Sequence, residues 1–119
     1  MAWEIEGTDE FTAWYKAQAE DLQETVDAAV EKLQESGPYL GRPYCDTLAK
    51  TSRLSNLKEL RIVHRGDAYR ILFAFGPLRI AILLWAGRKP DQGWYKKAIP
   101  KAERLYRIYL DELKREGKL

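Results

Sequence analysis

Apolar and polar residues alternate from Trp3 to Glu6, which is the period of a half-buried β-strand. Gly7 interrupts the alternation. Thr8 follows as a suitable N-cap for a helix whose first turn carries two acidic residues. One side of that helix holds Phe11, Trp14, Tyr15 and Gln18. The pattern therefore predicts a short strand followed directly by a helix.

A second helix is predicted from about Asp21, with Gly37-Pro38 ending it as a left-handed cap followed by a helix breaker. Its apolar positions have helical spacing and are Leu22, Val26, Ala29, Val30 and Leu33. The two helices form a hairpin with one apolar face, which we expect to cover a sheet. Residues 38–56 are rich in Pro, Gly, Ser and Thr and are interpreted as a connecting loop.

The stretch from Asn56 to Lys89 is dominated by β-branched, aromatic and aliphatic residues and predicts three consecutive strands. The first connection is expected to be a four-residue loop, Arg65–Ala68, with His64 paired with Tyr69. The second is expected to be a type I turn over Gly76–Arg79, with proline at its second position.

The second turn sets Phe75 opposite Ile80 and Arg70 opposite Trp85. One face of the sheet is then wholly apolar and comprises Leu60, Ile62, Ile71, Phe73, Ile80 and Ile82. The other face comprises Glu59, Arg61, Val63, Arg70, Leu72 and Leu83. The small side chains of Ala74 and Ala81 leave a depression on this face beside the arginines. This face is therefore predicted to be a groove containing guanidinium groups.

A basic loop, Ala86–Gly93, follows the third strand, and Trp94-Tyr95 comes next. The last helix is expected to begin near Pro100 and to run to about Arg115. The whole pattern predicts a single α+β domain over residues 1–119. An N-terminal strand and a helical hairpin pack on one face of a small, mostly antiparallel sheet, and a helix ends the chain.

Charge is distributed unevenly along the chain. Residues 1–38 hold ten acidic and two basic residues, whereas residues 56–98 hold nine basic and three acidic residues. We interpret the basic sheet half as a surface for a polyanion, in particular RNA. The alternative is two solvated surfaces of opposite sign.

Several classes of protein are disfavoured by the composition. The chain has one cysteine, Cys45, and one histidine, His64, so neither an internal disulfide nor a metal site of several such ligands is expected. We expect both residues to be non-catalytic. No apolar run is long enough to cross a membrane, and no secretory signal is visible, so a cytoplasmic protein is expected.

The remaining reactive side chains are those of Arg, Lys and Tyr. Such groups bind phosphates, stack on bases and stabilise a pentacovalent transition state. RNA supplies its own nucleophile, the 2′-hydroxyl, so a protein can cleave it by orienting that group without a metal or other cofactor. Lys89 lies near arginines and is a candidate for proton transfer.

The chain resembles the HigB-type toxins of the RelE/ParE superfamily, in particular their phage-derived Gp49-like branch. The resemblance lies in the ordered segments NLKELRI, YRILFAF, LRIAILLWAGRK and GWYKKAIPKAERLYRIYLDEL. The hairpin end GPYLGRP and the junction SRLSNLKELR fit the same branch. The resemblance covers nearly the whole chain.

The resemblance implies a RelE-like fold and a toxin of a type II toxin–antitoxin system. Members are mostly ribosome-dependent mRNA endonucleases that act without a metal and are neutralised by a helix-turn-helix antitoxin of the HigA kind. Carried over by position, Arg61 and Arg70 contact the phosphate and the transition state, Lys89 transfers a proton or contacts phosphate, and Tyr95 stacks on a base. The expected substrate-binding residues are Tyr95, Arg88, Trp85 and Glu59.

This chain departs from the branch in two places: Gly87-Arg88 replaces a Gly-Asp-like pair, and Gly76 stands where an aspartate commonly opens the turn. Other interpretations stay open. Glu59, Arg61 and Arg70 could form a structural ion-pair network, and Trp94 is favoured as a core anchor. Alternative functions are gyrase inhibition of the ParE kind and a non-catalytic RNA-binding or decayed toxin.

Overall fold

The computed structural model of the protein describes residues 2–48, 52, 54 and 56–119. Within these residues, five strands form one mixed sheet in the order β1-β5-β4-β3-β2. The strands are β1 (Glu4–Gly7), β2 (Cys45–Thr47), β3 (Leu57–His64), β4 (Asp67–Phe75) and β5 (Ile80–Arg88). The helices are α1 (Asp9–Lys16), α2 (Glu20–Ser36) and α3 (Trp94–Arg115), with short 3-10 turns η1 (Gly37–Tyr39) and η2 (Pro77–Arg79).

The helical hairpin and its caps are confirmed. The Thr8 hydroxyl accepts a hydrogen bond from the backbone N–H of Phe11 and caps α1, while Gly37 ends α2 with a φ of +54°. Strand β1 lies parallel to β5, and the other strand pairs are antiparallel. The α+β class with a mostly antiparallel sheet is therefore confirmed.

The prediction of an uninterrupted loop over residues 38–56 is wrong, because β2 lies within it. Cys45 pairs with Leu60 and Thr47 pairs with Lys58, so this three-residue strand extends the sheet beyond β3. A strand this short shows no alternation that would distinguish it from a loop. Part of the expected loop, residues 49–51, 53 and 55, lies outside the described residues.

The β3–β4 hairpin is tighter than predicted. His64 pairs with Asp67, so the turn consists of Arg65 and Gly66 alone, and both have positive φ values of 51° and 83°. Two-residue hairpin turns with two positive φ values match the twist of the strands. The change shifts the register by two residues, which keeps every side chain on its predicted face.

The β4–β5 register is wrong by one residue. Phe75 pairs with Ala81 rather than Ile80, because the connection contains two left-handed residues, Leu78 (φ 65°) and Arg79 (φ 56°). A bulge between Leu72 and Phe73 then changes the register again, so that Leu72 pairs with Trp85. One predicted pair, Arg70 with Trp85, becomes Arg70 with Gly87.

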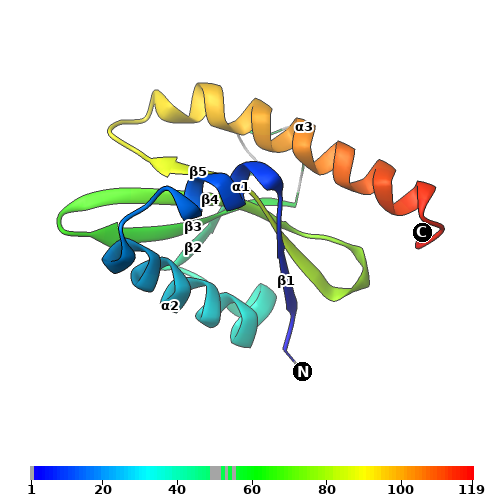
Figure 1. Cartoon of the computed structure of the whole chain (residues 1–119), viewed down its shortest axis with the longest axis horizontal. Helices are drawn as coiled ribbons and strands as arrows, with labels where there is room; N and C mark the ends of the chain where they lie inside the picture. The colour runs from blue at the N-terminus through cyan, green and yellow to red at the C-terminus, as the bar shows by residue number, and fades with distance from the viewer. Residues whose placement is uncertain (1, 49–51, 53, 55) are drawn as a thin grey trace.

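The shift exchanges side chains between two cores, one on each face of the sheet. Ala81 and Leu83 join the core beneath α1 and α2, whereas Ile82 joins the core beneath α3, where Ala74 lies on its predicted face. The prediction that Ala74 pairs with Ala81 on the same face of the sheet is therefore wrong. The face expected to be an open groove is partly covered by α3, which packs mainly on β4 and β5 (Figure 1).

Helix α3 begins at Trp94, well before the predicted start near Pro100, which lies inside it. The apolar side predicted for this helix is confirmed at Ile99, Ala102, Leu105, Tyr106 and Leu113, all of which are buried. The early start places the N-terminal end of α3 directly over the strands that carry the predicted site residues.

Candidate functional site

The N-terminal end of α3 is held on the sheet by close contact with β5. A Cβ atom on Gly87 would lie 3.1 Å from Nε1 of Trp94, so a larger residue here would require the indole to move by a few tenths of an ångström. Trp94 is half-buried against the core beneath α3, which agrees with its interpretation as an anchor. The next residue, Tyr95, consequently faces the sheet.

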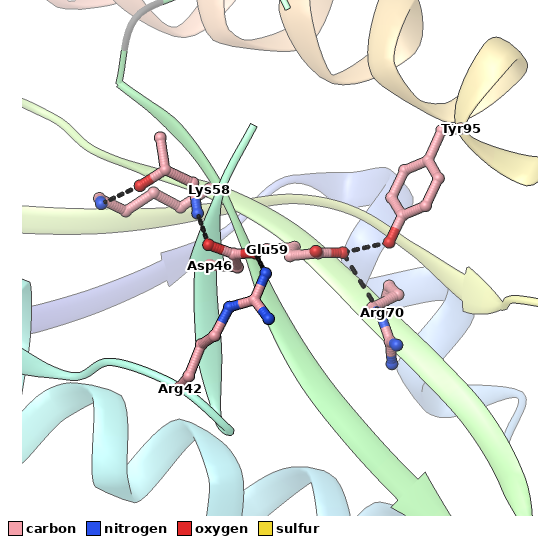
Figure 2. Close-up of polar contacts among 7 residues, drawn as sticks. Arg42, Asp46, Lys58, Glu59, Arg70 and Tyr95 are labelled. Carbon is pink, nitrogen blue, oxygen red and sulfur yellow. Dashed lines mark hydrogen bonds and ion pairs between the residues drawn. The ribbon is translucent and has the colours of Figure 1, made fainter. Parts of the chain in front are cut away.

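Glu59 of β3 and Arg70 of β4 form a buried ion pair beneath this helical turn. Each residue is only 5% exposed, and Nε of Arg70 lies 3.3 Å from Oε1 of Glu59. The hydroxyl of Tyr95 donates a hydrogen bond to the same carboxylate oxygen. Figure 2 shows Tyr95 reaching Glu59 from α3 while Arg70 reaches it from β4. We call these three residues the buried cluster.

The contact between Arg70 and Glu59 is electrostatic rather than a well-directed hydrogen bond. Nε of Arg70 is buried and has no partner in hydrogen-bonding geometry, although the carboxylate lies within ion-pair distance. Another nitrogen, Nη1, donates to the backbone oxygen of Tyr69 at 3.0 Å. The guanidinium is thus fixed in place, and one of its buried nitrogens lacks a well-directed hydrogen bond.

Burial, together with the hydrogen bond to Glu59, raises the pKa of Tyr95 to about 12. The phenol therefore keeps its proton at neutral pH. It acts as a donor to Glu59, and it is unsuited to be a general base. This contact joins residues 36 positions apart, and no local sequence pattern predicts it.

Arg61 lies directly opposite Arg70 in the β3–β4 pairing and is half-buried. Opposed like charges destabilise a strand pair, so two arginines here need an anionic neighbour. Glu59 lies on the same face, two residues before Arg61, and serves Arg70. Asp46 pairs with Glu59 across β2 and β3, so it lies on this face as well, within electrostatic reach of Arg61.

Lys89 follows β5, and its backbone N–H donates to the carbonyl of Ala68 at 2.8 Å. This hydrogen bond fixes the backbone of the lysine although it lies beyond the strand. Its ammonium nitrogen lies 5.5 Å from the centre of the Tyr95 ring. The structure therefore brings Lys89 to the buried cluster.

Two predicted site residues are not brought into this group. Arg88 pairs with Tyr69 and contacts Asp67 at 3.9 Å, so its side chain lies on the opposite face of the sheet from Arg70. Trp85 is half-buried, and the ammonium of Lys101 lies 4.4 Å from its ring centre. That ring face is therefore occupied and is not an open stacking platform.

The lone histidine and cysteine lie away from the cluster. His64 contacts Thr25 at 2.8 Å and Asp21 at 3.0 Å, which ties the end of β3 to α2. The hydrogen bond from His64 is the main cause that lowers the pKa of Asp21. Burial raises the pKa of the Cys45 thiol to about 11, which makes it a poor nucleophile at neutral pH.

Within the described residues, no helix is both long and apolar enough to span a bilayer. Similarly, the described part of the chain contains no cluster of three or more His, Cys, Asp or Glu residues suited to a metal ion.

Residues 13–107 match the family described as phage derived protein Gp49-like. The chain belongs to this family. Two Mycobacterium tuberculosis proteins are similar to it: the candidate toxin HigB2 is 41% identical over 105 residues, and the candidate toxin HigB3 is 42% identical over 92 residues. These alignments cover 86% and 76% of this chain.

The chain spans about half of HigB2 (52%) and 78% of HigB3. Among solved structures, a double arginine-to-alanine mutant of Escherichia coli toxin RelE in the free state aligns with a TM-score of 0.55. That alignment covers 84% of this chain and 97% of the RelE chain at 14% sequence identity. The RelE-like fold and the resemblance to HigB-type, Gp49-like proteins are thus confirmed.

Proposed function

We propose that this protein is the toxin of a type II toxin–antitoxin system and inhibits translation by cleaving mRNA on the ribosome. The observation that carries the proposal is that residues from four segments come together near one end of α3: Glu59 and Arg61 of β3, Arg70 of β4, Lys89 after β5 and Tyr95 of α3. The family membership and the similarity to candidate HigB toxins support the same role.

In the proposed reaction the RNA 2′-hydroxyl loses its proton to water, and its oxygen attacks the adjacent phosphorus. Arg61 and Arg70 stabilise the charge that develops on the phosphoryl oxygens. The bond from phosphorus to the 5′-oxygen then breaks, and that oxygen takes a proton from the Lys89 ammonium. The products are a 2′,3′-cyclic phosphate and a 5′-hydroxyl, and Lys89 regains its proton from water.

Glu59 and Tyr95 have positioning roles in this proposal. The Glu59 carboxylate already accepts from Tyr95 and pairs with Arg70, so it is not free to remove a proton. It orients the guanidinium of Arg70 toward the substrate side, while Tyr95 presents its ring beside Lys89 for contact with a base. The proposed partner that neutralises the protein is a helix-turn-helix antitoxin.

The deciding experiment is induced expression of the protein followed by mapping of mRNA 5′ ends. We expect growth arrest and new 5′ ends within coding sequences. Lys89→Ala should lower cleavage by roughly 10²- to 10⁴-fold, the range for a lost proton-transfer group. The matched variant Arg88→Ala removes one neighbouring cation from the opposite face of the sheet and should still cleave.

Other outcomes would replace the proposal. Intact mRNA together with DNA-damage signalling would indicate gyrase inhibition, and normal growth would indicate a non-catalytic module. Equal cleavage by wild type and Lys89→Ala would remove Lys89 from the proposed mechanism.

A further inference from the structure

The outer face of α3 carries a row of cations that takes no part in the buried cluster. The residues are Lys96, Lys97, Lys101, Arg104 and Arg107, and all five are exposed. At 3.6 residues per turn, their spacing confines them to a sector of about 140° of the helix circumference. We call this row the α3 stripe.

The stripe is fixed toward solvent because the other side of α3 is anchored in the core. Ala98, Ile99, Ala102, Leu105 and Tyr106 are all buried against the sheet. Figure 1 shows α3 lying along the outside of the molecule, from the yellow segment to the red one. The helix therefore presents these charges in a rigid array.

The charges of the stripe are not neutralised within the protein. In the described part of the chain, none of the five cations forms an ion pair with a carboxylate. The one acidic residue among positions 94–107 is Glu103, which is buried and accepts a hydrogen bond from Ser52. A helix face that serves only solubility normally interleaves both signs of charge.

One cation of the stripe is also positioned by an aromatic ring. Lys101 lies 4.4 Å from the ring centre of Trp85, a contact that favours the charged ammonium. The stripe begins one residue after Tyr95, so it is continuous with the candidate site. On the chain's N-terminal side the charge is reversed, because residues 1–38 hold ten acidic and two basic residues.

The dimensions and chemistry of the stripe favour a nucleic-acid backbone over a membrane. From Lys96 to Arg107 the helix rises about 16 Å, and double-stranded nucleic acid carries a phosphate charge about every 1.7 Å along its axis. A membrane-surface helix needs a free apolar face. The apolar side of α3 is instead buried, and Ile108 is the large apolar residue beside the stripe that is exposed, at 43%.

We propose that the α3 stripe docks on the phosphate backbone of a folded, double-stranded RNA segment while the end of α3 acts on a single strand. A rigid helix suits a duplex because its cations, like the phosphates of the duplex, are regularly spaced. Duplex RNA is recognised through its shape and its backbone. This inference rests on the proposed RNA-directed function, and it adds a second contact that orients the protein on its target.

The test measures equilibrium binding and requires no cleavage. The probe is a fluorescein-labelled RNA duplex of about 16 base pairs, the length that double-stranded RNA domains span. Wild type is compared with a triple variant, Lys97→Gln, Arg104→Gln and Arg107→Gln. A matched control carries Lys16→Gln, Lys32→Gln and Arg65→Gln, which removes the same charge from the α1–α2 side. Thermal unfolding verifies that all three proteins are folded.

We expect the triple variant to bind the duplex roughly tenfold or more weakly at about 0.1 M salt. The slope of log affinity against log salt should fall in magnitude by about two to three, close to one for each lost phosphate contact. The control should retain the wild-type slope to within about one. Equal affinity and slope for wild type and the triple variant would overturn the inference.

Two further probes identify the polyanion. A DNA duplex of the same sequence and vesicles of phosphatidylglycerol are titrated under the same conditions. If the protein binds both the DNA duplex and the vesicles more weakly than the RNA duplex, the inference is supported. Tighter binding to either one than to the RNA duplex overturns it. The readout is separable from the proposed function: a protein that binds the duplex through the stripe but leaves mRNA intact would refute cleavage alone. A cleaving protein whose triple variant binds normally would refute the stripe alone.

Discussion

At the scale of single residues, the Glu59 carboxylate links the strands to the last helix. It is 5% exposed, and it meets Arg70 from β4 and Tyr95 from α3 at the same oxygen. Removing an ion from water costs free energy that only good pairing offsets. The cluster is therefore costly if it only supports the fold, and its position beside Arg61 and Lys89 supports the proposed role in binding an anion.

The protonation of Tyr95 provides a first prediction. Its pKa is about 12 in the folded protein, against an ordinary value of 10.0. Between these values the folded protein holds the phenolic proton and the unfolded chain has lost it, so the free energy of unfolding falls as pH rises. In Tyr95→Phe the free energy of unfolding should decrease less steeply with pH between about pH 9 and about pH 12, as measured by urea unfolding.

The control for this prediction is Tyr39→Phe, because Tyr39 is 95% exposed. That variant should follow the wild-type dependence on pH. If the free energy of unfolding depends on pH in the same way in wild type and in Tyr95→Phe, the Tyr95 phenol is not held protonated by its surroundings.

The ion pair of Glu59 with Arg70 gives a second prediction at this scale. Glu59→Leu alone leaves a buried guanidinium unpaired and should lower the free energy of unfolding by about 3–5 kcal/mol. The double variant Glu59→Leu/Arg70→Met removes both charges and should lose less than Glu59→Leu alone. Urea unfolding of wild type, the two single variants and the double variant gives a double-mutant cycle. If the losses in the free energy of unfolding are strictly additive, Glu59 and Arg70 are not coupled.

At the scale of elements, the position of α3 decides what the sheet can do. The helix packs on the face that also carries the arginines, and its N-terminal end meets Gly87 at close range through Trp94. Tyr95 and Lys89 border this end. A small displacement of the first turn of α3 would consequently move Tyr95 away from Glu59.

Gly87→Ala tests this dependence. The new methyl group would lie 3.1 Å from Trp94 Nε1, so the indole must shift, and overpacking of this kind costs about 1–3 kcal/mol. We expect a lower free energy of unfolding and a changed near-ultraviolet circular dichroism signal from the displaced indole. Gly41→Ala is the matched control, because its Cβ would meet no atom within 4 Å. Equal stability of both variants would contradict the close approach.

Much of the fold could be predicted because strong local signals coincide with the observed elements. Thr8 as a cap, Gly37 as a terminator and the alternation in β3 each act over a few residues. The β4–β5 register could not be predicted, since a bulge at Leu72/Phe73 and left-handed Leu78 and Arg79 depend on packing rather than on local preference.

The candidate site could be predicted in part for the same reason. The sequence pattern predicts that Arg61 and Arg70 share a face, because a two-residue shift in strand register leaves the alternation of side chains between faces unchanged. The resemblance adds Lys89 and Tyr95. Their burial beneath α3 could not be predicted. It depends on the helix beginning at Trp94 rather than near Pro100. A proline lies comfortably in the first turn of a helix, and that preference placed the start too late.

At the scale of the whole molecule, charge divides the protein into an acidic α1–α2 side and a basic α3 side. The Cα trace extends over 43 × 32 × 27 Å. Electrostatic influence decays over a Debye length of about 8 Å at physiological salt and about 30 Å at 0.01 M. Acidic residues on α2 should therefore oppose RNA binding at low salt and be largely screened under physiological conditions.

Replacing Glu24, Glu31 and Glu35 with Gln tests this division, since all three are exposed on α2. We expect RNA affinity to change by less than about twofold at physiological salt and to rise several-fold at about 0.01 M salt. Asp91→Asn is the contrasting variant, because Asp91 lies two residues from Lys89 and its amide oxygen can still accept from the Gly93 backbone N–H. It should raise affinity at both salt concentrations. A large effect of the α2 replacements at physiological salt would show instead that this side contacts the RNA directly, because screening leaves no other route by which distant charges could act.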